Sequence, residues 1–173
     1  MKTTLKLVLF VIAVAVLCNN VSAQTPKLAH INQDELIVSM SEYDSAVVKM
    51  QKFTKVLEDE LEAMGVERNK KFEEYTTKSK DWTDLVRSSK EQELNAIGQR
   101  IQLFQEQAQE SIQQEQAKLF QPVYEKANKA IEDVAKEQGI TYVISANPQI
   151  LLFKAVGSTD LLPSVKQKMG IKK

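Results

Sequence analysis

The sequence has 173 residues, with 23 basic and 23 acidic side chains, one histidine and one cysteine. This balanced charge argues against a general nucleic-acid binder, because phosphate contacts require a basic surplus. A single histidine, and the lack of a G-x-x-x-x-G-K-[ST] phosphate loop, leave little for catalysis or ATP hydrolysis. We therefore expect a protein that is not an enzyme and has no nucleic-acid partner.

Residues 1–23 have the order of a secretory signal peptide. Two lysines precede an apolar run from Leu7 to Leu17, and Val21-Ser22-Ala23 stands before Gln24. The apolar run is shorter than the roughly 18 to 20 residues that a membrane-spanning helix needs, and the small residues suit signal peptidase. We expect secretion through a cleaved signal peptide, with the mature chain starting at Gln24.

Cys18 offers an alternative, in which the chain is acylated and anchored to a membrane. A lipid-modified cysteine follows a small residue, whereas Cys18 follows the bulky Leu17. Cleavage after Ala23 leaves no cysteine and hence no disulfide. The mature chain then has 21 basic and 23 acidic residues, a net charge of −2. We expect no anchor, even if the protein works close to a membrane.

The first mature residues predict a short strand and a short helix. Residues 27–31 (KLAHI) alternate in the manner of a strand, and residues 32–40 (NQDELIVSM) can form a brief helix. From Ser41 a longer helical pattern begins, with Ser41-x-x-Asp44 as a variant of the capping box.

Apolar residues then recur every three or four positions in two long runs. The first run consists of Tyr43, Val47, Met50, Leu57, Leu61 and Met64, and the second of Leu94, Ile97, Ile101, Phe104, Ala108, Ile112, Leu119, Val123, Ala127, Ala130 and Val134. Heptad-like spacing of this length requires a partner helix. We therefore expect an antiparallel coiled-coil hairpin over residues 41–139, ended by Gly139.

The turn of this hairpin is predicted near residues 84–90. Ser88-x-x-Glu91 forms a second capping box, and the midpoint of residues 41–139 lies near Lys90. Matched arms of about 45 residues would be roughly 65 Å long.

Three residues interrupt the predicted helices. Gly65 and Gly98 each cost about 1 kcal/mol relative to alanine, and Pro122 removes one helical hydrogen bond. They are either tolerated imperfections or places where the arm bends, and Pro122 lies where the arm approaches the body.

The residues after Gly139 return to a β-rich pattern. Residues 140–146 (ITYVISA) and 149–156 (QILLFKAV) stand on either side of Asn147-Pro148, which predicts a β-hairpin. Residues 158–160 (STD) can cap a last short helix that ends near Met169.

Residues 24–40 and 140–173 therefore form one composite β-rich body from which the hairpin projects, an α+β fold. A sheet this small is marginal alone, and we expect no other sizeable core in the body. A β-core shared between chains would stabilise it, so we expect an oligomer. Its predicted contact residues are Leu28, Ile31, Tyr142, Val143, Ile144, Leu151, Leu152 and Phe153.

Residues 68–90 combine basic and apolar side chains. Seven basic and four acidic residues give this stretch a charge of +3, whereas the rest of the hairpin is acidic. Apolar groups beside cations offer an adaptable surface for an unfolded polypeptide. The predicted binding residues are Phe72, Tyr75, Trp82, Leu85, Val86, Lys70, Lys71, Lys78, Lys80 and Arg87. The alternative is that these side chains, Trp82 and Leu85 above all, only hold the tip together.

The remaining polar residues predict no chemistry. His30 has no serine or carboxylate near it in motif spacing, so we interpret it as a packed or interface histidine. Acidic runs such as residues 58–60 and 73–74 are consecutive on helices, where carboxylates diverge instead of converging on a cation. We expect no catalytic residue, no bound metal and no cofactor.

Three segments resemble the Skp/OmpH family of periplasmic chaperones. They are residues 27–43 (KLAHINQDELIVSMSEY), 119–145 (LFQPVYEKANKAIEDVAKEQGITYVIS) and 151–170 (LLFKAVGSTDLLPSVKQKMG). The resemblance covers nearly the whole mature chain, although the middle is little more than coiled-coil composition. It implies a homotrimer with a common β-core and three hairpins around a cavity, where unfolded outer-membrane β-barrel proteins are held without ATP.

The chain departs from this family in its acidic arms, since family members often carry a strongly basic total. The basic tip is what remains of that charge. Two other functions compete with the chaperone, a structural coiled-coil spacer and an adaptor of a periplasmic efflux pump. A spacer would need no terminal β-core, and such adaptors carry several β-domains where this chain has room for one small body.

Overall fold

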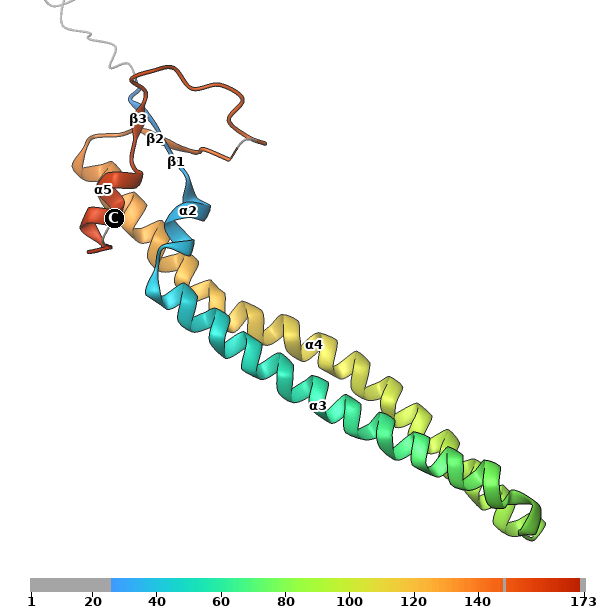
Figure 1. Ribbon diagram of the computed structural model, residues 1–173. Coiled ribbons are helices and arrows are strands. Elements are labelled where there is room, and N and C mark those ends of the chain that lie inside the picture. The colour runs from blue at the N-terminus through green and yellow to red at the C-terminus, as the bar shows by residue number, and fades with distance from the viewer. Residues whose placement is uncertain (1–25, 148, 172–173) are drawn as a thin grey trace, which may run out of the picture.

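The computed structural model describes residues 26–147 and 149–171, which form a small body and one long arm (Figure 1). In chain order the elements are β1 (Leu28–Ile31), α2 (Gln33–Val38), α3 (Ser41–Lys78), the 3₁₀ turn η2 (Ser79–Asp81), α4 (Asp84–Glu137), β2 (Tyr142–Ser145), β3 (Thr159–Asp160) and α5 (Leu162–Lys168). This confirms the α+β composition. The predicted signal peptide, Cys18 and Gln24 lie outside the described residues.

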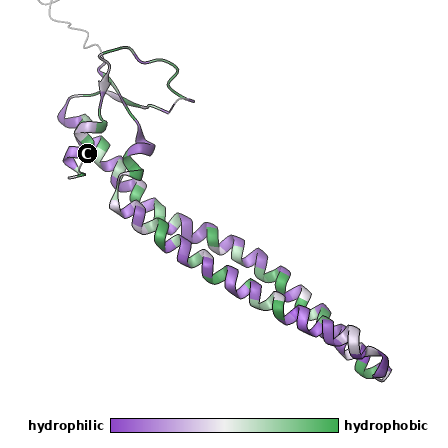
Figure 2. Cartoon of the chain, in the orientation of Figure 1, coloured by the Kyte–Doolittle hydropathy of each residue, from purple (hydrophilic) through white to green (hydrophobic). Residues whose placement is uncertain are grey.

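The arm consists of α3 and α4, which run antiparallel side by side (Figure 1). Every residue of the two predicted apolar runs is buried or half-buried, so the predicted seam between the helices is confirmed. In the outer part of the arm, Ile97 alone among the described residues is fully buried. Figure 2 shows apolar bands alternating with hydrophilic ones along both helices. Two helices therefore pack together without enclosing their apolar side chains.

The turn lies at residues 79–83, before the predicted position of 84–90. Thr83, and not Ser88, caps α4, because its side-chain oxygen accepts a hydrogen bond from the N–H of Val86 at 3.4 Å. Ser88 lies inside α4. The prediction assumed arms of equal length, but α4 is longer because its last turns, with Val134 and Ala135, belong to the core of the body.

The sheet has the order β2-β1-β3, and β1 is parallel to both neighbours. Leu28 pairs with Tyr142, and His30 with Asp160. The predicted β-hairpin is therefore wrong: β2 and β3 do not pair with each other, and residues 149–156 form no strand. Parallel strands need a crossover, which the helical arm supplies between β1 and β2. β1 then occupies the place between the other two strands. Pro148 itself lies outside the described residues.

The body has a hydrophobic core of its own, contrary to the expectation from sequence. Leu36, Met40, Leu161 and Val165 are fully buried. They form one cluster with Ile31 and the C-terminal part of α4. Burying an aliphatic side chain of this size contributes roughly 1.5 to 3 kcal/mol. Two short helices and the end of α4, rather than the sheet alone, therefore stabilise the body within one chain.

The helix ends follow the sequence signals only in part. Met40 precedes α3 and makes no side-chain cap, so the predicted capping box of Ser41 and Asp44 is wrong. The side chain of Asn32 accepts a hydrogen bond from the N–H of Glu35 at 3.1 Å, and that of Asp160 accepts one from the N–H of Leu162 at 2.9 Å. Gly139 follows α4 with φ of 63°, a conformation that favours glycine. No helix in the described part of the chain is both long enough and apolar enough to cross a membrane.

Candidate functional site

An aromatic pair closes the tip of the arm. Tyr75 near the end of α3 and Trp82 in the turn meet edge to face, with 5.9 Å between the ring centroids. The hydroxyl of Tyr75 donates a hydrogen bond to Glu91 of α4, and this bond raises the pKa of Tyr75. Both aromatic side chains are half-buried. These two predicted binding residues therefore also hold the two helices together.

Two basic residues of the tip are also engaged within the chain. Arg87 donates from Nε to the backbone carbonyl of Ser79 at 3.3 Å and from a terminal nitrogen to that of Trp82 at 3.5 Å. Lys71 forms an ion pair with Glu93 across the two helices. The hydrogen bond between them lowers the pKa of Glu93 and raises the pKa of Lys71. Both cations thus stabilise the hairpin.

The other predicted tip residues face solvent. They are Phe72, Leu85, Val86, Lys70, Lys78 and Lys80. Leu85, next to the turn, is 83% exposed. The structure therefore divides the predicted surface into four residues that close the tip and six that are open to a ligand. The alternative, that these side chains only hold the tip together, is right for Trp82 and wrong for Leu85. Client binding by the six exposed residues stays a prediction.

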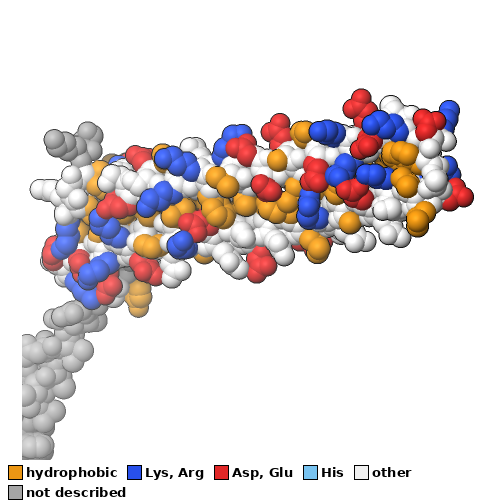
Figure 3. Space-filling view, turned by 90° about the horizontal axis from the view of Figure 1, so that it is seen from below, with side chains coloured by type: hydrophobic (Ala, Val, Ile, Leu, Met, Phe, Trp, Pro, Cys, Tyr) orange, Lys and Arg blue, Asp and Glu red, His pale blue; other side chains and the backbone are white. Residues whose placement is uncertain are grey.

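Exposed apolar side chains continue along the arm, beyond the predicted surface. Val48, Val56 and Val66 of α3 and Leu103 of α4 are exposed. Val48 and Val66 are about five helical turns apart and so share a face, away from the seam. These valines are too widely spaced to form a run that recurs every three or four residues, which is why the sequence pattern did not reveal them. In Figure 3 a broken line of hydrophobic side chains runs along the arm between charges of both signs.

The body presents a second apolar surface. Leu28, Tyr142, Ile144, Leu152 and Phe153 are exposed, and Phe153 is 80% exposed. Leu151 is half-buried, whereas Ile31 is buried in the core of its own chain and Val143 packs against that core. β2 is an edge strand, so one row of its backbone groups is unpaired. The predicted contact residues other than Ile31 and Val143 thus lie on or near an open strand edge and loop.

His30 lies between two polar residues that its sequence neighbours did not reveal. Its Nε2 is 2.9 Å from Oγ of Ser158, and its Nδ1 is 3.9 Å from Oδ1 of Asp160. The second distance is too long for the hydrogen bond that orients histidine in a Ser-His-Asp triad. Nδ1 has no hydrogen-bond partner among the described residues, and His30 is 6% exposed. The packed histidine is confirmed, and it connects β1 to the segment around β3.

The acidic side chains form no metal site in the structure as far as it is described. Within residues 26–147 and 149–171, no group of three or more His, Cys, Asp or Glu side chains could hold an ion. Residues 58–60 lie on the exposed face of α3, where Asp59 pairs with Lys55 at 2.5 Å.

Comparison with known proteins bears on the fold and the family. A family model described as "Outer membrane protein (OmpH-like)" matches residues 27–169. A crystal structure of a candidate outer membrane chaperone, OmpH-like, from Caulobacter crescentus CB15 has a similar fold, with a TM-score of 0.68. The two chains are 14% identical, and 86% of each is covered. No curated protein sequence matches the chain.

Proposed function

The chain belongs to the OmpH-like outer membrane protein family, and from this premise we propose that it is an ATP-independent holdase chaperone of the periplasm. It binds unfolded outer-membrane β-barrel proteins and prevents their aggregation. The family match and the fold shared with a candidate outer membrane chaperone support this proposal. The signal-peptide pattern of residues 1–23 supports the periplasmic location.

The observation that carries the proposal is the exposed apolar surface of a two-helix arm. Phe72 and Leu85 near the tip, and Val56 and Val66 along the shaft, are each more than half exposed. An unfolded polypeptide offers scattered apolar side chains and no fixed shape, so a receptor for it needs many weak contacts. Such contacts form and break without nucleotide. A folded partner would instead call for a shaped, continuous patch.

The exposed lysines of the tip give this surface a second attraction. Lys70, Lys78 and Lys80 are exposed, and they can meet acidic residues of the bound polypeptide. Exposed charges act over about 8 to 10 Å in ordinary buffer, so their contribution is salt-dependent. Tyr75 and Trp82 act in this scheme by keeping the two helices together.

We further propose that the protein is a homotrimer joined through the body. The exposed residues Leu28, Tyr142, Ile144, Leu152 and Phe153 support this, together with the unpaired edge of β2. Burying them between chains would stabilise the assembly without disturbing the core around Leu36. Several arms around one space would also strengthen weak contacts by raising their effective concentration.

The direct test is dilution of a urea-unfolded β-barrel protein into buffer that contains the mature protein and no nucleotide. The proposal predicts that light scattering falls as the chaperone is raised to stoichiometric amounts, and that ATP changes nothing. A structural spacer or an efflux-pump adaptor would leave the aggregation rate unchanged.

A further inference from the structure

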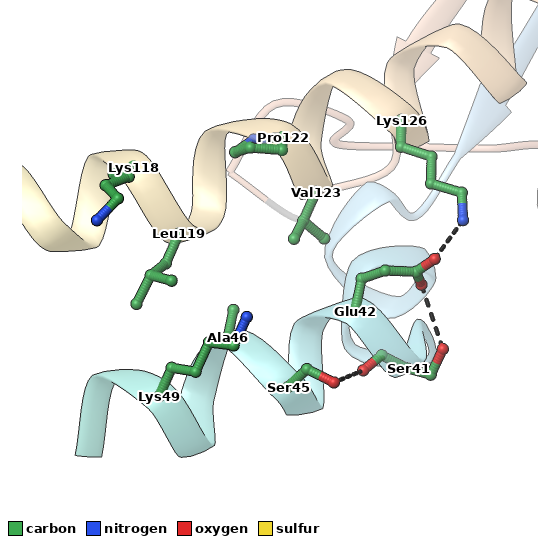
Figure 4. Close-up of a pocket in the computed structure, with 10 residues that line it drawn as sticks. All are labelled: Ser41, Glu42, Ser45, Ala46, Lys49, Lys118, Leu119, Pro122, Val123 and Lys126. Carbon is green, nitrogen blue, oxygen red and sulfur yellow. Dashed lines mark hydrogen bonds and ion pairs between the residues drawn. The ribbon is translucent and has the colours of Figure 1, made fainter. Parts of the chain in front are cut away.

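A cleft of about 470 Å³ lies where the arm joins the body, between the first turns of α3 and the segment of α4 around Pro122 (Figure 4). Its apolar wall consists of Ala46, Leu119, Pro122 and Val123. Ala46 and Val123 are fully buried and Leu119 is half-buried, so this wall is part of the packed structure. The volume falls in the range of roughly 300 to 1,000 Å³ that is typical of ligand sites.

The polar rim of the cleft is basic. Lys49, Lys118 and Lys126 line it, against one acidic residue, Glu42. Glu42 is occupied by an ion pair with Lys126, and the hydrogen bond from Lys126 lowers the pKa of Glu42. Lys49 and Lys118 come from the two opposite walls, α3 and α4 (Figure 4). Lys118 also pairs with Glu115 at 3.0 Å, so Lys49 is the lysine of the rim that makes no ion pair among the described residues. The two lysines flank an apolar wall on a shaft that is otherwise acidic.

Pro122 leaves a backbone carbonyl of α4 without its usual hydrogen bond. Proline has no N–H, so the carbonyl of Lys118, four residues earlier, lacks the donor that a helix normally supplies. Pro122 and Lys118 both line the cleft. The segment of α4 that borders the cleft therefore carries a backbone acceptor without its intrahelical partner.

We propose that this cleft is a second client-binding site, which takes an apolar side chain of an unfolded polypeptide together with a neighbouring carboxylate. The inference rests on the proposed holdase function and deepens it. Leu119 and Pro122 contact the apolar side chain, with Ala46 and Val123 behind them, and Lys49 and Lys118 attract the carboxylate. Clients would then be held at the base of the arm as well as at its tip, by segments that combine apolar and acidic residues.

Two charge-reversal variants of the full mature chain separate this site from a general effect of charge. Lys49→Glu/Lys118→Glu places negative charge on the cleft, whereas Lys52→Glu/Lys129→Glu makes the same change outside it. Each variant alters one lysine of α3 and one of α4. Each also breaks one ion pair within α4, from Lys118 to Glu115 or from Lys129 to Asp133. Unfolding curves should be similar for the two.

The probe is a short unstructured peptide that contains leucine, phenylalanine and aspartate, compared with a peptide that has lysine in place of aspartate. In methyl-labelled wild-type protein, the acidic peptide should shift the signals of Ala46 and Val123, and the lysine peptide should not. Its affinity should fall about two- to thirtyfold in Lys49→Glu/Lys118→Glu, since each of two exposed charge pairs contributes about 0.2 to 1 kcal/mol. The control variant should keep wild-type affinity.

The inference is overturned if the acidic peptide leaves the Ala46 and Val123 signals unmoved, or if both variants bind it equally. This titration tests whether the cleft binds the peptide, independently of the aggregation assay. A wild-type protein that fails to keep a β-barrel protein soluble contradicts the holdase function. A wild-type protein that succeeds, with both variants equally effective, contradicts only the role of the cleft in holding clients.

Discussion

Trp82 and Leu85 are three residues apart at the tip, yet their surroundings differ. Trp82 packs on Tyr75, whereas Leu85 is 83% exposed. Trp82→Ala should therefore lower the free energy of unfolding by at least about 0.5 to 1.5 kcal/mol, the value of an aromatic pair. Leu85→Ala should change it by less than about 0.5 kcal/mol but weaken client capture. Urea unfolding and the aggregation assay measure the two effects. Equal stability of the two variants would contradict the role of Trp82.

The ion pairs between the helices make the arm sensitive to acid. Glu42 and Glu93 have pKa values lowered from 4.5 by hydrogen bonds from Lys126 and Lys71. A lowered pKa in the folded state means that these pairs stabilise the arm above pH 4.5 and are lost as the pH falls through the folded-state pKa. Glu93→Gln should therefore melt at a lower temperature than wild type near neutral pH, with the difference shrinking below pH 4.5. A difference that stays constant down to about pH 3 would contradict this assignment.

At the scale of the elements, the glycines inside the two long helices offer a clear test of packing. A Cβ atom added to Gly65 or Gly98 would meet no atom within 4 Å. Gly65→Ala and Gly98→Ala should therefore each stabilise the protein, by up to about 1 kcal/mol, through helix propensity alone. Gly139→Ala is the control, since φ of 63° strains any residue with a Cβ and should make that variant less stable. Thermal unfolding that shows Gly65→Ala or Gly98→Ala as destabilising would contradict this account.

The sequence predicted the elements better than their connections. The seam was predictable because burial in a two-helix arm follows the helical period, and Tyr43 to Val134 obey it. The turn was misplaced because equal arms were assumed. Ion pairs between α3 and α4 indicate its true position, because the turn lies midway in sequence between the two paired residues. Lys71 with Glu93, and Glu67 with Arg100, are centred on residues 82 and 83.5. The β-hairpin failed because strand propensity identifies a strand but says nothing of its partner, and Tyr142 pairs with Leu28.

The candidate site was predictable in part, for a similar reason. Composition indicated a basic, apolar tip. Only the structure separates Leu85, whose side chain is exposed, from Tyr75, whose hydroxyl donates a hydrogen bond to Glu91. The neighbours of His30 could not be predicted, because Ser158 is 128 residues away and reaches it through the sheet. Contacts between distant segments leave no local pattern in a single sequence.

At the scale of the whole molecule, the exposed surface of the body predicts concentration-dependent stability. If Leu152 and Phe153 are buried between chains, the midpoint of thermal unfolding should rise with protein concentration. Leu152→Ser/Phe153→Ser should abolish that dependence and yield monomers in sedimentation. Val66→Ser, on the exposed face of the arm, should keep the oligomer. A compact monomer at micromolar wild-type concentration, with unfolding independent of concentration, would contradict the proposed trimer.

The central claim is that the arm holds unfolded outer-membrane proteins, and a shortened arm tests it most directly. Removing residues 54–67 and 97–110 takes facing stretches from α3 and α4, keeps the tip and the body, and shortens the arm by about 21 Å. The measurement is light scattering by a urea-unfolded β-barrel protein diluted into each variant at equal concentration. The account predicts that the full-length protein suppresses aggregation and that the shortened one, still oligomeric, loses most of that effect. Equal suppression by the two proteins would contradict it.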